Sequence, residues 1–167
     1  MPITTALLGE YPTHLPIVAD WIFHQWAILK PGATLENVIE RLQSHLQTNE
    51  LPIMVIALDG AQCIGTASLR SSDLQGHEDL SPWLASVYVP EERRRMGIGA
   101  ALVQAVEIHA IRLGIRNLYL FTPDREDFYS AIGWESYTTT THDDQPVVVM
   151  RRQLSLNITS AQLEPIS

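Results

Sequence analysis

Apolar side chains recur at three- and four-residue spacing in two early segments of the chain. Residues 14–29 carry one such stripe, which predicts an amphipathic helix. Lys30-Pro31-Gly32 interrupts the stripe, and Thr34 has the short hydroxyl side chain typical of a helix N-cap. A second stripe runs through residues 35–46. The pattern therefore predicts two consecutive helices joined by a short link.

A strand pattern follows these helices. The apolar runs at residues 51–58 and 62–69 flank Asp59-Gly60, and an Asp-Gly pair between such runs predicts a β-hairpin. Residues 71–82 are polar and contain turn formers, so they predict a loop long enough to serve a function. Residues 83–89 predict a third strand because they are largely β-branched and aromatic.

The second half of the chain alternates helices and strands. A helix is predicted over residues 98–113, with Gly114 as its C-terminal stop. A strand follows at residues 117–121. Asp124 can then cap a short helix that ends at Gly133.

A final pair of strands, residues 134–141 and 147–152, flanks a polar turn and predicts a closing hairpin. The predicted element order is ααβββαβαββ, an α/β (α+β) arrangement. No repeat or linker interrupts it, so one domain is expected over residues 1–167, with a weakly patterned tail at residues 153–167.

The composition excludes several classes of protein. With 46% hydrophobic and 18% charged residues, the chain suits a globular fold and neither a disordered nor a fibrous one. No apolar run approaches the roughly 20 residues that span a bilayer, so no membrane partner is expected. A single cysteine, Cys63, excludes an intrachain disulfide and, without a close histidine pair, the usual zinc patterns. The lack of an export signal favours a cytoplasmic protein.

The formal net charge is −8, from 11 basic and 19 acidic residues. This sign argues against nucleic acid as a partner, because binding to phosphate backbones depends on clustered Lys and Arg. The charge is unevenly distributed, with three basic and nine acidic side chains in residues 1–85, six and four in residues 86–125, and two and six in residues 126–167. A bound anion is therefore expected in the central segment.

The central segment holds two closely spaced glycines between a predicted strand and a predicted helix. Gly97 and Gly99 lack a Cβ, so a phosphate could reach the free N–H groups of the first helical turn, where the helix dipole is positive. A P-loop does not fit because no Lys lies near, and a dinucleotide fingerprint fits poorly because Leu102 stands at its third glycine. On spacing alone, a tight turn with a solvated arginine cluster is an equally good interpretation.

The run Arg94-Arg95-Met96-Gly97-Ile98-Gly99 resembles the Arg/Gln-x-x-Gly-x-Gly/Ala signature of the GNAT-superfamily N-acetyltransferases. The strand before it and the segment Phe128-Tyr129-Ser130-Ala131-Ile132-Gly133-Trp134 also resemble that family, in the same order. The resemblance is densest from Trp83 to Tyr137. It implies a central mixed, twisted sheet with helices on both faces and a splayed pair of parallel strands, residues 83–89 and 117–121.

The same resemblance implies that acetyl-CoA is the acyl donor and that no metal takes part. The pantetheine arm would bond backbone groups freed by the splay, where an N–H could also polarise the thioester carbonyl. The glycine turn would hold the pyrophosphate, and Asp124 stands where many relatives have an Asn near the coenzyme. The expected coenzyme-binding residues are Val87, Tyr88, Val89, Arg94, Arg95, Met96, Gly97, Ile98, Gly99, Ala100 and Asp124.

Acetyl transfer to an amine needs a base for the ammonium proton and an acid for the departing thiolate. Tyr129 matches the family's tyrosine before the turn at Gly133, and the resemblance implies that its phenol is the catalytic acid. By pattern alone, a tyrosine that packs its ring on a helix face is the commoner interpretation.

The base is not inherited from the family pattern. Trp83 and Tyr119 stand at the places where several relatives carry a Glu. The alternatives that the sequence leaves open are Glu78, Asp79, His24 and a water held by Ser86. The residues expected on the acceptor side are His24, Trp83 and Ser86.

The sequence therefore predicts an N-acetyltransferase that transfers the acetyl group directly to a primary amine of a small molecule or peptide. The acidic flanks of the central segment favour a cationic amine. The alternative is a non-catalytic acyl-CoA-binding regulatory module, because the family's Glu is missing. The resemblance also raises the expectation of a homodimer formed through the last strands.

Overall fold

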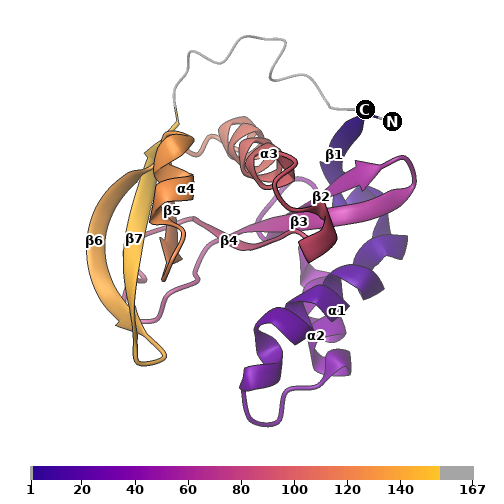
Figure 1. The fold of residues 1–167 in the computed structure, drawn as a ribbon, viewed down its shortest axis with the longest axis horizontal. Helices are drawn as coiled ribbons and strands as arrows, with labels where there is room; N and C mark the ends of the chain where they lie inside the picture. Colours follow the sequence, from indigo (N-terminus) through magenta and orange to yellow (C-terminus); the bar gives the residue numbers. More distant parts are fainter. Residues whose placement is uncertain (1, 155–167) are drawn as a thin grey trace.

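The computed structural model describes residues 2–154, which form a seven-stranded sheet with helices packed against it (Figure 1). The strand order is β1-β2-β3-β4-β5-β7-β6, and β4–β5 is the parallel pair among the described strands. The strands are β1 (Ile3–Leu7), β2 (Ile53–Asp59), β3 (Gln62–Arg70), β4 (Trp83–Tyr88), β5 (Asn117–Thr122), β6 (Glu135–His142) and β7 (Gln145–Gln153).

Helices cover both faces of this sheet. The helices are α1 (Leu15–Gln25), α2 (Leu35–Leu42), α3 (Ile98–Arg112) and α4 (Glu126–Ala131). In β2, Val55 and Ala57 lie in the core cluster that contains α3, whereas Met54 and Ile56 lie in the cluster that contains α1 and α2. Successive strand side chains point to opposite faces, so this continuous apolar run buries both. The predicted fold class is confirmed.

Figure 1 shows the sheet as two halves that meet where β4 approaches β5. One half contains β1 to β4 with α1, α2 and α3, and the other contains β5, β6 and β7 with α4. Helix α3 connects β4 to β5 across the face opposite α1 and α2. This crossover brings the start of α3 to the boundary between the halves.

The structure confirms the predicted helices and shifts their ends. Thr34 caps α2 as expected, because its hydroxyl accepts a hydrogen bond from the Asn37 N–H at 3.1 Å. The first predicted helix stops at Gln25, and a separate 3₁₀ turn covers Ala27–Leu29. The stripe predicted over residues 35–46 likewise ends as a 3₁₀ turn beyond α2.

Strand β1 has no counterpart among the predicted elements. It has five residues and pairs antiparallel with β2, Ile3 opposite Asp59. A short edge strand carries too few alternations to stand out, and its partner lies far along the chain. The position of β1 therefore depends on its pairing with β2, which the local sequence pattern does not show.

Both predicted hairpins are present, with one change of register. Asp59 pairs with Gln62, so the β2–β3 turn consists of Gly60-Ala61 and not of Asp59-Gly60. Gly60 has φ 62°, which the absence of a Cβ permits. In the β6–β7 turn, Asp143 and Asp144 have φ 50° and 63°, the left-handed pair that a type I′ turn requires.

Two further predictions concern membrane-spanning helices and the C-terminal tail. No helix among residues 2–154 is long and apolar enough to cross a membrane. The tail predicted from residue 153 starts inside β7, which ends at Gln153, and residues 155–167 lie outside the described residues.

Candidate active site

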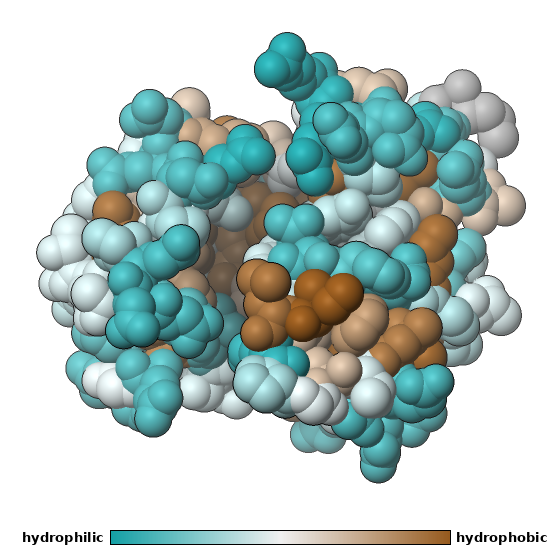
Figure 2. Space-filling model, turned by 60° about the horizontal axis from the view of Figure 1, so that its bottom comes forward, coloured by the Kyte–Doolittle hydropathy of each residue, from teal (hydrophilic) through white to brown (hydrophobic). Residues whose placement is uncertain are grey.

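Strands β4 and β5 diverge almost from their first residues. Among the described residues they pair only through Trp83 and Tyr119, and the Tyr119 N–H donates to the Pro82 carbonyl at 3.1 Å. Figure 2 shows the surface hollowed between two lobes, with hydrophobic residues in the floor of the groove. The predicted splay is confirmed. The edge of β4 that follows Trp83 faces a gap that an extended ligand could enter as a strand would.

A β-bulge lies in β4 beside this gap. The β3–β4 register runs from Ser68 opposite Ala85 to Thr66 opposite Tyr88, so β4 carries one extra residue. Ser86 has φ 55°, in the left-handed region. A bulge bends its strand and leaves local backbone groups unpaired. The sequence analysis expected the backbone of the neighbouring Val87 to bind the coenzyme through such unpaired groups.

The glycine turn at the start of α3 has an open, anion-accepting geometry. Gly97 is the N-cap residue, with φ 80°, and no side chain of the described residues caps this end. A Cβ built on Gly97 would meet no atom within 4 Å, so the glycine faces open space. The N–H groups of the first turn, from Ile98 to Ala100, precede the first intrahelical bond, which Ala101 makes to the Gly97 carbonyl. Phosphate oxygens suit these donors.

The arginines before this turn have different partners. Arg93 is committed to the protein, because its guanidinium donates to Asp59 at 3.0 Å and to Gln62 at 3.1 Å. Arg94 donates from Nε to the Val89 carbonyl at 2.8 Å, which occupies a backbone group expected to serve the coenzyme. Arg94 also lies over the ring of Tyr88.

The two residues between Arg94 and Gly97 are exposed to solvent. Arg95 has φ 65°, a left-handed conformation that bends the chain just before the glycine. Met96 is exposed beside it. The guanidinium of Arg95 can therefore reach an anion at the start of α3 without leaving an internal partner.

Helix α4 faces the glycine turn across the gap. A Cβ on Gly99 would lie 3.5 Å from the Phe128 ring, so the glycine allows α4 to approach α3. Tyr129 follows Phe128 and is buried in the same core cluster as α3. Its ring lies 5.0 Å from that of Phe128 and 6.1 Å from that of Trp134. Burial raises the pKa of the Tyr129 phenol to about 12.

Asp124 does not cap α4, contrary to prediction. The N-cap residue is Arg125, and no side chain of the described residues bonds to the helix start. Instead the Thr122 hydroxyl accepts from the N–H groups of Asp124 and Arg125, at 3.3 and 2.9 Å. Thr122 therefore orders the turn that follows β5, and α4 begins one residue later than a cap at Asp124 would place it. The carboxylate of Asp124 is left at the exposed surface.

Trp83, which the sequence places on the acceptor side, is fully buried. Its indole N–H donates to the Leu80 carbonyl at 2.6 Å, and its ring packs against Tyr119 and Phe121. Leu74 and Leu80 of the 71–82 loop cover it. Trp83 therefore belongs to an apolar cluster beneath the start of β4 and presents no surface to a ligand.

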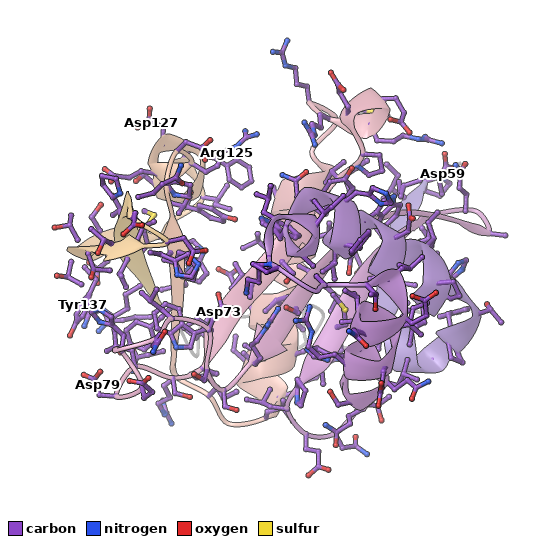
Figure 3. The ribbon with its side chains drawn as sticks, turned by 90° about the horizontal axis from the view of Figure 1, so that it is seen from below. Asp59, Asp73, Asp79, Arg125, Asp127 and Tyr137 are labelled. Atoms are coloured by element: carbon purple, nitrogen blue, oxygen red, sulfur yellow. The ribbon has the colours of Figure 1, made fainter. Side chains whose placement is uncertain are left out.

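The residues considered as the base are dispersed. His24 is exposed on α1 and bonds within its own helix, to the Asp20 carbonyl at 2.9 Å. Glu78 is fully exposed, and its carboxylate accepts from the Gly76 N–H at 3.0 Å, which lowers its pKa. Asp79 lies at the outer edge of the molecule in Figure 3. The structure does not bring these side chains together.

Ser86 instead contacts Arg70, which lies beside Asp73. The sequence analysis proposed neither of these residues for the site. The Arg70 guanidinium donates to the Ser86 hydroxyl at 2.7 Å. Asp73 stands 3.7 Å from Arg70 and lies between the two halves in Figure 3. The charged pair at residues 70 and 73 carries no motif, so only the fold places it beside the bulge. Among the described residues, no group of three His, Cys, Asp or Glu side chains could hold a metal.

Solved structures of acetyltransferases share this fold. The aminoglycoside 6'-N-acetyltransferase from Enterococcus faecium has 17% identity and a TM-score of 0.69, covering 95% of this chain and 100% of that one. The yncA structure from Salmonella typhimurium, which contains acetyl-CoA, has 13% identity and a TM-score of 0.69, covering 94% and 96%. AAC(6')-Ib in complex with ribostamycin and coenzyme A has 20% identity and a TM-score of 0.68, covering 92% and 94%.

Comparison with protein-family models gives stronger evidence than these structures, which show the fold alone. No curated protein matches it significantly. The model of the Acetyltransferase (GNAT) family matches residues 15–134, a span that includes the glycine turn, the splayed strands and Tyr129. The chain belongs to the GNAT family, whose members are acetyl-CoA-dependent N-acetyltransferases.

Proposed function

We propose that the chain transfers the acetyl group of acetyl-CoA directly to a primary amine that approaches the splay from the face carrying α1 and α2. The coenzyme enters from the opposite face, between the start of α3 and helix α4. The observation that carries this proposal is the uncapped start of α3, with left-handed Gly97 open to solvent, beside strands that pair at a single position.

The residues of the glycine turn suit the coenzyme's phosphates. The N–H groups of Ile98, Gly99 and Ala100 and the side chain of Arg95 would hold the pyrophosphate, since they combine free donors with positive charge. The edge of β4 near Val87 would bond the pantetheine arm. When bound, acetyl-CoA supplies an acetyl thioester, which an amine can attack.

Tyr129 acts as the acid in this proposal. With a pKa of about 12, its phenol keeps its proton throughout the neutral range. The neutral amine attacks the thioester carbonyl carbon, and the C–N bond forms as the C–S bond breaks. The phenol gives its proton to the sulfur, and the phenolate regains a proton through water from the one that the nitrogen loses. A backbone N–H beside the bulge at Ser86 polarises the carbonyl during this step.

The substitution Tyr129→Phe tests the acid. It removes the hydroxyl and keeps the ring that packs against Phe128 and Trp134. We expect kcat to fall by about a hundredfold or more, with an unchanged Kd for coenzyme A. The readout is thiol release from acetyl-CoA over a panel of primary amines, with coenzyme binding measured by calorimetry.

Tyr11→Phe is the matched control, because Tyr11 is an exposed tyrosine outside the groove. It should leave both quantities unchanged. Equal turnover by wild type and Tyr129→Phe at every pH would contradict the acid assignment. Tight coenzyme binding with no turnover on any amine would contradict the proposed reaction and favour a binding module.

A further inference from the structure

A polar cluster occupies the acceptor face of the sheet beside the bulge. Arg70 is the last residue of β3 and stands directly opposite Trp83 of β4. Its neighbour Leu69 lies in the core cluster of α3. Because side chains alternate along a strand, Arg70 projects to the other face, which carries α1 and α2.

The Arg70 guanidinium is held in place and remains incompletely paired. It donates to Ser86 at 2.7 Å, and its contact with Asp73 is 3.7 Å, longer than a hydrogen bond. Its Nε is buried and has no hydrogen-bond partner among the described residues. A buried donor without a partner carries a desolvation cost that a suitable acceptor would remove.

Asp73 brings the one acidic side chain of this cluster. The side chain of Asp73 is 19% exposed and the side chain of Arg70 is 26% exposed, so a ligand can reach both. Burial raises the pKa of Asp73, and the charges of Arg70 and Lys30 oppose this shift. The cluster thus combines one carboxylate with positive charge close to it.

We propose that the acceptor is an α-amino-acid-type primary amine, whose carboxylate binds Arg70 and whose ammonium binds Asp73. This proposal rests on the proposed acetyl transfer. A planar guanidinium matches a carboxylate through charge-assisted hydrogen bonds, and Nη1 of Arg70, whose contact with Asp73 is longer than a hydrogen bond, is the donor available for it. The amine and carboxylate of an α-amino acid are separated by one carbon, which suits opposite charges as close as those of Arg70 and Asp73.

The position of the cluster also suits the reaction. Ser86 is the bulged residue of β4, at the edge where the acetyl group would lie, and it bonds directly to Arg70. A ligand carboxylate on Arg70 would therefore place the neighbouring amine beside the splay. This proposal replaces the cationic amine expected from the acidic flanks with a zwitterionic acceptor.

The first experiment uses wild-type protein and matched pairs of acceptors. Each pair consists of an L-α-amino acid and its amide, which keeps the amine and side chain and lacks the carboxylate. We expect kcat/KM to be about ten- to a hundredfold higher for the acids, the range for a charge-assisted hydrogen bond. The best acid should also react faster than its amide when both are supplied at equal concentrations far below KM.

Variants of the cluster then locate the effect. Arg70→Met should abolish the preference for acids, because kcat/KM for acids should fall by about ten- to a hundredfold more than kcat/KM for amides. Arg70→Lys, which keeps the charge and loses the fork, should retain part of the preference. Arg116→Met is the control, because Arg116 is an exposed arginine directly before β5, and it should keep the full preference.

The outcomes separate this proposal from the proposed function. Equal kcat/KM for acids and amides in wild type overturns the amino-acid assignment and leaves acetyl transfer standing. An equal loss on both substrates in Arg70→Met also overturns it, because the pair would then be purely structural. Failure of every amine to release thiol overturns the proposed reaction itself.

Discussion

Lowering the pH should destabilise the protein through His45. This histidine is 5% exposed, and its Nδ1 lies 3.2 Å from the Ser44 hydroxyl, while Nε2 has no partner among the described residues. Burial and the charge of Arg70 together lower its pKa from 6.5 to about 4. The fold therefore holds His45 neutral where an unfolded chain would protonate it.

The sign and size of the effect follow from this difference. Above pH 6.5 the imidazole is neutral in both states and costs nothing. As pH falls from 6.5 to about 4, the unfolded state gains a proton that the folded state does not, so stability is lost across that window. At about 1.36 kcal/mol per pH unit, the free energy of unfolding should fall by about 3 kcal/mol. That is a large share of the roughly 5–15 kcal/mol typical of a folded domain.

Urea denaturation at pH 7, 5.5 and 4.5, followed by tryptophan fluorescence, measures this loss. The comparison is with His45→Gln, which cannot gain the proton and should lose about 3 kcal/mol less over the same window. Burial also lowers the pKa of His109, but that histidine is present in both proteins. His24→Gln, which alters an exposed ring, is the control. If His45→Gln and wild type lost equal stability, the account of His45 as a buried neutral imidazole would be wrong.

Two further predictions concern the glycine turn and the boundary between the halves. Gly97→Ala should cost about 1 kcal/mol through its positive φ and weaken coenzyme A binding in calorimetry, whereas Gly32→Ala, at φ 76° and equally open, should cost similar stability and leave binding unchanged. Arg152→Met should cost about 1 kcal/mol in urea denaturation, more than Glu107→Gln, because Arg152 lies 3.2 Å from the half-buried Glu107 and its charge offsets the desolvation of that carboxylate. A smaller loss for Arg152→Met than for Glu107→Gln would refute this.

Features encoded by neighbouring residues could be predicted from the sequence. Thr34 caps α2 through the third residue beyond it, and Gly97 begins α3 with a left-handed turn that favours glycine. The turn at Asp143-Asp144 also lies where polar residues separate two strands. In each case the causes lie within a few residues, so the pattern contains them.

Features that depend on distant partners could not be predicted in this way. Strand β1 exists because β2, nearly 50 residues further along the chain, offers an unpaired edge. The splay of β4 and β5 came from the family resemblance, since no spacing encodes a strand pair that parts after one position. Residues far apart decide these outcomes.

The two halves of the candidate site differ in the same way. The coenzyme side is one contiguous stretch, from Arg94 to Ala100, whose chemistry is largely backbone N–H groups. The proposed acceptor side joins Arg70, Asp73 and Ser86, which come from β3, the loop after it and β4. Neither composition nor spacing shows that these groups meet.

Net charge is consequently a poor guide to the acceptor. The value of −8 sums side chains over the whole surface, and at physiological salt a charge more than about 8 Å away is largely screened from an exposed ligand. An amine beside the bulge would experience mainly Arg70 and Asp73, which are partly buried and screened less. In the proposed site, the pairing of these two side chains, and not the acidity of the flanking segments, would therefore determine which acceptor is selected.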